Sequence, residues 1–172
     1  MKILIAYDGS PDAKNAVTLA GDLFDGTPAV VLTVWEGFSQ VISRAEAGLT
    51  SALDFEQIDA AAERAAHKCA EEGTGHARVS GLPAESRVVR RHGTTWETIL
   101  EQAADIDADI IVLGSRGLSG VKSLLLGSVS RAVLQHSDRP VLVSPANGTA
   151  AKGRHPHPAP SRHDSAFFSA RL

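Results

Sequence analysis

Short apolar runs alternate along this chain with segments whose apolar residues recur every three or four positions, and this alternation constrains the fold most strongly. The runs are typical of β-strands, whereas the wider spacing is typical of helices with one buried face. The predicted strands are residues 2–7, 29–35, 85–91, 108–113 and 140–144. Strands that alternate with helices predict a parallel sheet covered on both faces. The expected fold class is therefore α/β: a doubly wound, Rossmann-like open sheet of five mainly parallel strands with about four helices.

Local signals mark where three of the helices begin or end. Ser10 followed by Pro11 is typical of a helix start with a capping hydroxyl. Thr94, with Glu97 three residues later, predicts a capping box at a second helix start. The amphipathic helix between these two is expected to end near Gly73, because glycine commonly terminates helices.

The composition excludes several classes of function. The chain has 172 residues and a formal net charge of −3, without the basic stripe of a nucleic-acid-binding protein. No apolar run reaches the length of a membrane span. The first apolar run is too short for a signal peptide and is interrupted by Asp8. The single cysteine, Cys69, cannot form an internal disulfide. We therefore expect a cytoplasmic protein with no nucleic-acid or membrane partner.

Residues 1–145 are expected to form one domain, followed by a disordered tail over residues 146–172. The periodic pattern stops at the boundary, and the remainder is rich in Pro, Ala, Ser and basic residues. Such a composition does not bury enough apolar surface to fold. Histidines in the tail could bind a metal ion weakly, but a solvated tail is the simpler interpretation.

A glycine-rich segment follows the fourth predicted strand directly. Its spacing is Gly114-x2-Gly117-x9-Gly127, and Ser128 opens a helix predicted over residues 127–136. In an open parallel sheet, ligands bind beyond the carboxyl ends of the strands, where the strand order reverses. A helix N-terminus at that edge offers unpaired N–H groups and the positive end of the helix dipole. The segment therefore predicts an anion site, and phosphate is the usual anion.

Individual residues of the segment extend this prediction. Gly114 and Gly117 are expected to take positive φ and to let the backbone approach a ligand closely. The hydroxyls of Ser128 and Ser130 would add donors, and Arg116 would add charge unless it is a solvated loop residue. Neither the Walker spacing nor the dinucleotide pattern fits the segment.

The glycine spacing, placed between a strand and a helix, resembles that of the universal stress protein family in its nucleotide-binding branch. The resemblance covers about residues 1–145. It includes a first strand that ends in Ala6-Tyr-Asp8-Gly-Ser10 and a last strand that begins Pro140-Val-Leu-Val143. Similar proteins bind ATP, often with a divalent metal on the phosphates, and commonly dimerise through the last strand. The family often has a proline where this chain has Thr95.

The resemblance implies which residues would contact a nucleotide. Asp8 would contact its ribose or adenine side, Val34 would lie against the adenine, and the two parts of the glycine motif would hold the ribose and phosphates. The implied site consists of Ala6, Asp8, Val34, Leu113, Gly114, Arg116, Gly117, Gly127, Ser128, Val129 and Ser130. The implied ligand is ATP, on whose phosphates Mg²⁺ or Mn²⁺ could be carried. No catalytic residue and no metal ligand of the protein is predicted.

Two functions of different classes fit such a site. The first is an ATP-binding stress-response regulatory protein, in which nucleotide occupancy modulates conformation or the contacts of a dimer or partner. The second is a slow ATPase or phosphotransferase, which needs a positioned base and charge neutralisation at the γ-phosphate. No Walker lysine, paired carboxylates or nucleophile–base pair stands out, so the regulator is expected. A module that has lost nucleotide binding is disfavoured by the complete glycine motif.

The last predicted strand, residues 140–144, is expected at an edge of the sheet. Val141 and Val143 alternate there with Leu142, so the strand is apolar throughout. An exposed apolar edge strand invites pairing with another copy of the chain. We therefore predict a homodimer built on residues 140–144.

Overall fold

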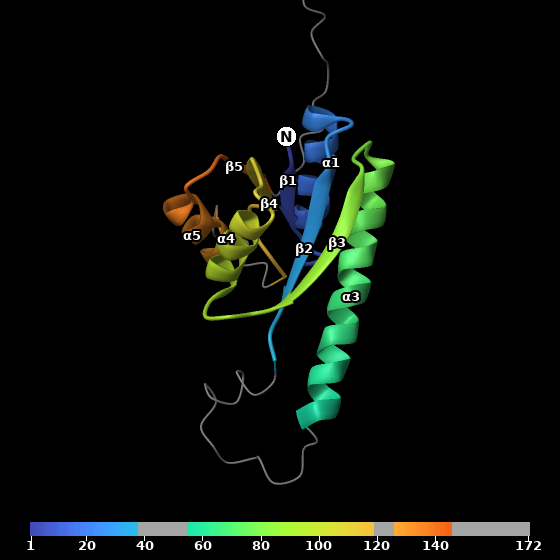
Figure 1. Ribbon diagram of the computed structural model, residues 1–172, viewed down its shortest axis with the longest axis vertical. Helices are drawn as coiled ribbons and strands as arrows, with labels where there is room; N and C mark the ends of the chain where they lie inside the picture. Colours follow the sequence, from blue (N-terminus) through green and yellow to red (C-terminus); the bar gives the residue numbers. More distant parts are fainter. Residues whose placement is uncertain (38–54, 119–125, 146–172) are drawn as a thin grey trace, which may run out of the picture.

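The computed structural model describes residues 1–37, 55–118 and 126–145, which form one sheet with helices packed on it (Figure 1). The strands are β1 Ile3–Ala6, β2 Ala29–Trp35, β3 Ala84–Arg90, β4 Ile110–Gly114 and β5 Val141–Ser144. The helices are α1 Pro11–Phe24, α3 Phe55–Val79, α4 Thr95–Asp105 and α5 Ser128–His136. The predicted fold class is confirmed, and every strand pair within these ranges is parallel. The predicted tail, residues 146–172, lies outside the described residues.

The strand order is β3-β2-β1-β4-β5, so the order reverses beside β1. The chain adds β2 and β3 on one side of β1 and then crosses over to add β4 and β5 on the other. Ala6, at the end of β1, is in register with Leu32 of β2 and with Leu113 of β4. The carboxyl ends of β1 and β4 therefore flank the place where open α/β sheets bind ligands.

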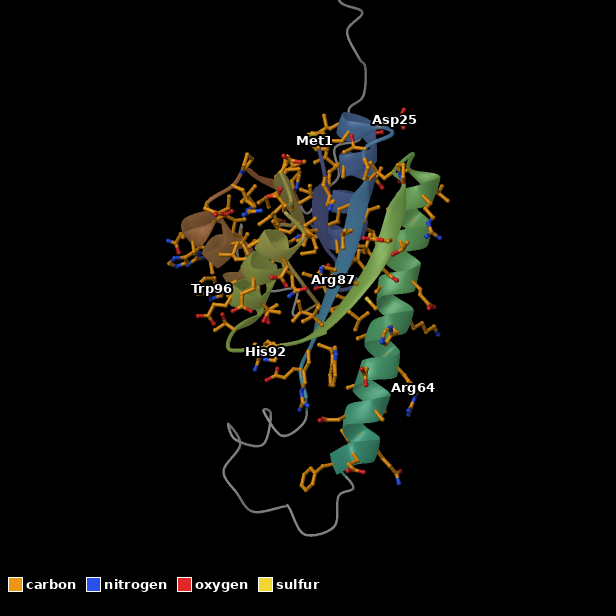
Figure 2. All side chains as sticks on the ribbon, viewed as in Figure 1. Met1, Asp25, Arg64, Arg87, His92 and Trp96 are labelled. Atoms are coloured by element: carbon orange, nitrogen blue, oxygen red, sulfur yellow. The ribbon has the colours of Figure 1, made fainter. Side chains whose placement is uncertain are left out.

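Alternating strand residues build two hydrophobic layers, one on each face of the sheet. The layer against α1 and α3 includes Ile5, Val17, Val31, Ala77 and Val112. The layer against α4 and α5 includes Leu4, Leu32, Ile99, Ile111 and Val133. Figure 1 shows these two helix pairs on opposite sides of the sheet. Charged side chains project outward, as Arg64 does from α3 in Figure 2. No helix among the described residues is long and apolar enough to cross a bilayer.

Both predicted helix starts are confirmed by their capping bonds. The Ser10 hydroxyl accepts a hydrogen bond from the backbone N–H of Ala13 at 3.2 Å, and Pro11 is the first residue of α1. Both bonds of the capping box between Thr94 and Glu97 are present at the start of α4. The hydrogen bonds from Thr94 hold the pKa of Glu97 below its usual value. A side-chain oxygen therefore satisfies one orphan N–H group of the first turn at each of these two helix starts.

The amphipathic helix that was predicted to end near Gly73 does not end there, because α3 continues to Val79. Gly73 lies against the ring of Tyr7, and a Cβ at this position would come within 2.7 Å of the Tyr7 Cδ1 atom. The glycine is thus required by packing and does not end the helix. The chain leaves the helix at Gly81, whose φ of +91° lies in the left-handed region that favours glycine.

Gly73→Ala is expected to lower the free energy of unfolding by about 1 kcal/mol or more, because crowding against Tyr7 outweighs the helix propensity that alanine adds. Gly75 on the same helix is exposed, and a Cβ there would meet nothing within 4 Å. Gly75→Ala is therefore a matched control and should raise the free energy of unfolding by roughly 0.5–1 kcal/mol. Urea unfolding of both variants measures the difference. Equal stabilisation by the two substitutions would contradict the packing role of Gly73.

Candidate functional site

A hollow lies at the carboxyl edge of the sheet, beside the ends of β1 and β4 and the first turns of α4 and α5. About 160 Å³ of its volume can hold water-sized molecules, and the remainder opens to solvent. Every site residue predicted from the sequence lines it: Ala6, Asp8, Val34, Leu113, Gly114, Arg116, Gly117, Gly127, Ser128, Val129 and Ser130. The fold therefore brings all of these residues to one place.

Other lining residues were not predicted, namely Tyr7, Ala13, Leu32, Thr95 and Ile99. The apolar spacing of α4 marks Ile99 as buried, but the residue's neighbours depend on how α4 packs across the sheet. The Tyr7 hydroxyl donates a hydrogen bond to Glu72 at 3.2 Å, and burial raises the pKa of Tyr7. This phenol therefore stays protonated at neutral pH and fastens the end of β1 to α3.

One half of the hollow is apolar. Ala6 and Leu113 come from the ends of two adjacent strands, and they belong to the same hydrophobic layer as Val34 and Ile99. Ile99 comes from α4, which packs on that face of the sheet. Only 3% of this residue is exposed. Such a wall is suited to a flat ring that is itself largely apolar on its faces.

The strand β2 runs past the end of β1 and leaves backbone groups facing the hollow. The N–H of Tyr7 donates to the carbonyl of Leu32 at 2.8 Å, and there the pairing of β2 with β1 ends. On its other side, the carbonyl of Trp35 accepts from Arg91, which follows β3. Backbone groups alternate sides along a paired strand, so the N–H and C=O of Val34 point past the end of β1. A donor beside an acceptor complements an edge of adenine.

The other half of the hollow is polar and meets the start of α5. The N–H of Gly127 donates to the carbonyl of Ser115 at 2.7 Å, which places the helix start against the loop that follows β4. No described side chain caps this helix. The N–H groups of Ser128, Val129 and Ser130 lie in the first turn, where an α-helix provides no acceptor. Together with the positive end of the helix dipole, they form a geometry that binds anions.

Two expectations about the glycine segment are wrong in detail. Gly114 and Gly117 do not have positive φ. Their constraint is steric: a Cβ on Gly114 would lie 2.6 Å from the Asp12 carbonyl carbon, and one on Gly117 would lie 2.7 Å from Asp8 Oδ2. The Ser130 hydroxyl is buried and donates to the carbonyl of Gly114 at 2.8 Å, so it joins α5 to β4 and does not face a ligand.

The charged side chains around the hollow form hydrogen bonds between the segment after β1 and the loop after β4. Asp8 accepts hydrogen bonds from the N–H groups of Ser10 at 3.0 Å and Leu118 at 3.2 Å. Arg116 lines the hollow while its Nε lies 3.2 Å from Asp12. His92 is exposed between β3 and α4 (Figure 2) and does not line the hollow. Within the described ranges, no group of three or more His, Cys, Asp or Glu could hold a metal ion.

Comparisons of the sequence and of the structure with known proteins agree with one another. Residues 1–145 match the model of the universal stress protein family. Universal stress protein YxiE of Bacillus subtilis is 30% identical over 145 residues, which cover 83% of this chain and 97% of that protein. The structure of hypothetical protein MJ0577 of Methanocaldococcus jannaschii superposes with a TM-score of 0.67 at 25% identity, covering 83% and 94% of the two chains.

A universal stress protein solved in complex with cAMP has the same fold. It superposes with a TM-score of 0.59 at 23% identity, covering 85% of this chain and 97% of that one. At this identity the likeness shows the fold alone. The match to the family model extends over most of the chain, and this chain therefore belongs to the universal stress protein family.

Proposed function

We propose that this protein is a cytoplasmic, ATP-binding stress-response regulator, in which nucleotide occupancy modulates conformation or the contacts of a dimer or partner. One observation carries the proposal: a single hollow joins an apolar half that includes Val34 to the start of α5, which no described side chain caps. A nucleotide needs both halves, one for its base and one for its phosphates. Family membership supports the stress-response role.

In the proposed arrangement, adenine lies in the apolar half against Val34 and Leu113, and Asp8 contacts the ribose. The phosphates lie against the glycine loop at Gly117 and the first turn of α5, with charge from Arg116. Mg²⁺ or Mn²⁺ would be held by the phosphates. A universal stress protein of the same fold has been solved in complex with cAMP, an adenine nucleotide, but the proposal rests on the residues of this chain.

A slow ATPase or phosphotransferase is the alternative function. Hydrolysis requires a base that positions water at the γ-phosphate. Asp8 and Asp12 are the acidic residues that adjoin the glycine loop among the described residues, and both accept several hydrogen bonds from that loop or its neighbours. Carboxylates engaged in this way support the fold of the site, which favours the regulator.

We also propose that the protein forms a homodimer through residues 140–144. Within the described sheet, β5 is an edge strand paired with β4. The carbonyls of Pro140 and Ser144 accept hydrogen bonds from the β4 side. Because backbone groups alternate, Val141 and Val143 direct their N–H and C=O groups away from β4. This free row is available to a second copy.

Ser128→Pro is expected to weaken ATP binding roughly tenfold to a hundredfold, because it removes one backbone N–H from the phosphate half. Proline is favoured at the first helical position, and the preceding Gly127 is already extended, with φ −69° and ψ 165°. Ser128→Ala is the matched control: it removes the hydroxyl, keeps the N–H and should lower the affinity by less than about threefold. Calorimetric titration with ATP and with adenosine measures both variants.

The affinity for adenosine should not change in Ser128→Pro, since adenosine carries no phosphate. If the parent protein binds neither ligand, the nucleotide proposal fails. If it binds ATP and both Ser128 variants bind ATP equally well, α5 does not hold the phosphates.

Phosphate release from ATP is expected to be no faster with the parent protein than with Ser128→Pro, in the presence of Mg²⁺ or Mn²⁺. The regulator requires occupancy without turnover, whereas an ATPase would release phosphate in proportion to ATP bound. A colorimetric phosphate assay at saturating ATP makes the comparison. Release by the parent that clearly exceeds release by Ser128→Pro would favour the enzyme.

Val143→Pro is expected to convert a dimer into a monomer, because it removes an outward N–H without removing a bond to β4. Proline is tolerated on an edge strand when its nitrogen faces away from the sheet. Val143→Ala keeps the N–H and serves as the matched control, so it should remain dimeric. Sedimentation velocity at micromolar concentration distinguishes the two states. A monomeric parent, or a dimeric Val143→Pro, would contradict the proposed interface.

A further inference from the structure

Asp12 holds the loop after β4 although it does not line the hollow. It lies in the first turn of α1, where its side chain is buried and only 6% of the residue is exposed. Its Oδ2 atom accepts three hydrogen bonds. The donors are the Ser115 hydroxyl at 2.9 Å, the Arg116 backbone N–H at 3.1 Å and the Arg116 Nε–H at 3.2 Å. One oxygen therefore fixes both the backbone and the side chain of Arg116.

Asp12 is the last of three alternating residues that bond this loop. Asp8 accepts from the backbone N–H of Leu118 at 3.2 Å. The Ser10 hydroxyl lies 3.4 Å from the carbonyl of Arg116, to which it donates. The segment that follows β1 is thus hydrogen-bonded to Ser115, Arg116 and Leu118 of the segment that follows β4. The shape of the glycine loop is set by the start of α1 as well as by its own glycines.

Asp12 holds the guanidinium of Arg116 through its Nε–H group. Among the described residues, its Nε–H has an acceptor, while its terminal N–H groups have none. Arg116 also lines the hollow. A guanidinium carries five N–H donors in a rigid plane, so fixing one of them fixes the directions of the others. This geometry leaves the terminal groups to a ligand anion.

We propose that Asp12 is a positioning residue for the phosphates of the nucleotide, acting through Arg116 and the backbone at Ser115 and Arg116 without touching the ligand. The inference rests on the proposed ATP binding. It assigns a role in that binding to a residue that does not line the hollow. A charge-neutralising role makes the opposite prediction, because removal of a carboxylate that only offsets Arg116 would strengthen ATP binding. Three donors that meet at one buried oxygen favour positioning, since together they fix the direction of both the backbone and the side chain of Arg116.

Asp12→Ala is expected to weaken ATP binding roughly tenfold or more and adenosine binding by less than about twofold, because the phosphate contacts alone depend on Arg116. Asp22→Ala is the matched control: Asp22 is exposed on the same helix, and its removal should change neither affinity. Asp12→Asn keeps an oxygen for the same donors and should recover part of the ATP affinity. Calorimetric titration of full-length variants, checked for folding by circular dichroism, measures each affinity.

The outcomes separate this inference from the proposed function. A parent protein that binds no ATP overturns both. If the parent binds ATP, the inference alone is overturned when Asp12→Ala binds ATP as well as the parent, binds it more tightly, or loses ATP and adenosine equally. In an Arg116→Ala background the effect of Asp12→Ala should shrink, and an undiminished effect also overturns the inference. Should Asp12→Ala not fold, Asp12→Asn makes the same comparison, with an expected selective loss of about threefold or more.

Discussion

The strand β1 is hydrogen-bonded on both sides, to β2 and to β4, and the rest of the structure depends on this double pairing. It makes β1 the point where the strand order reverses. Because parallel strands end at the same edge, the segment after β1 and the segment after β4 leave the sheet side by side. The hollow, its two lining loops and the bonds between them all follow from that arrangement.

The two segments differ in what they contribute. The segment after β4 supplies the close approach of backbone, above all at Gly114, where a Cβ would collide with the backbone of Asp12. The segment after β1 supplies side chains that hold this backbone in place, at Asp8, Ser10 and Asp12. A short exposed loop that contains glycine does not order itself by packing, so an adjacent rigid element has to order it. The capped start of α1 is that element.

Much of this organisation could be predicted from the sequence because its signals are local. The predicted strand 29–35 coincides with β2, and the capping residues Ser10 and Thr94 lie where α1 and α4 begin. The glycine segment was predicted in the same way, since a strand end and a glycine spacing are local patterns, whereas the contacts of Asp8 and Val34 were implied by the resemblance to the family. That these residues bind a nucleotide stays a prediction.

The failures concern residues whose role depends on a partner far away in the chain. Gly73 reads as a helix stop until the ring of Tyr7 is placed against it. Asp12 reads as an ordinary acidic residue of a first helical turn, because its partner Arg116 is 104 positions away. Ser130 reads as a ligand donor until β4 provides its acceptor. In each case the missing information is tertiary packing, which no local pattern contains.

The uncapped start of α5 makes the stability of this region depend on the solution around it. At the starts of α1 and α4, a side chain of the protein itself accepts a hydrogen bond from an N–H group of the first turn, so this capping does not depend on a solute. The described residues provide no side-chain acceptor at α5, and any anion that binds there only in the folded state stabilises that state by mass action, by about 2.7 kcal/mol at one hundred times its dissociation constant. Because α5 is the element that precedes β5 in the chain, an anion that stabilises α5 is expected to stabilise the segment that carries the edge strand. The free energy of unfolding of this part of the chain is therefore expected to rise with the concentration of an anion that binds at α5.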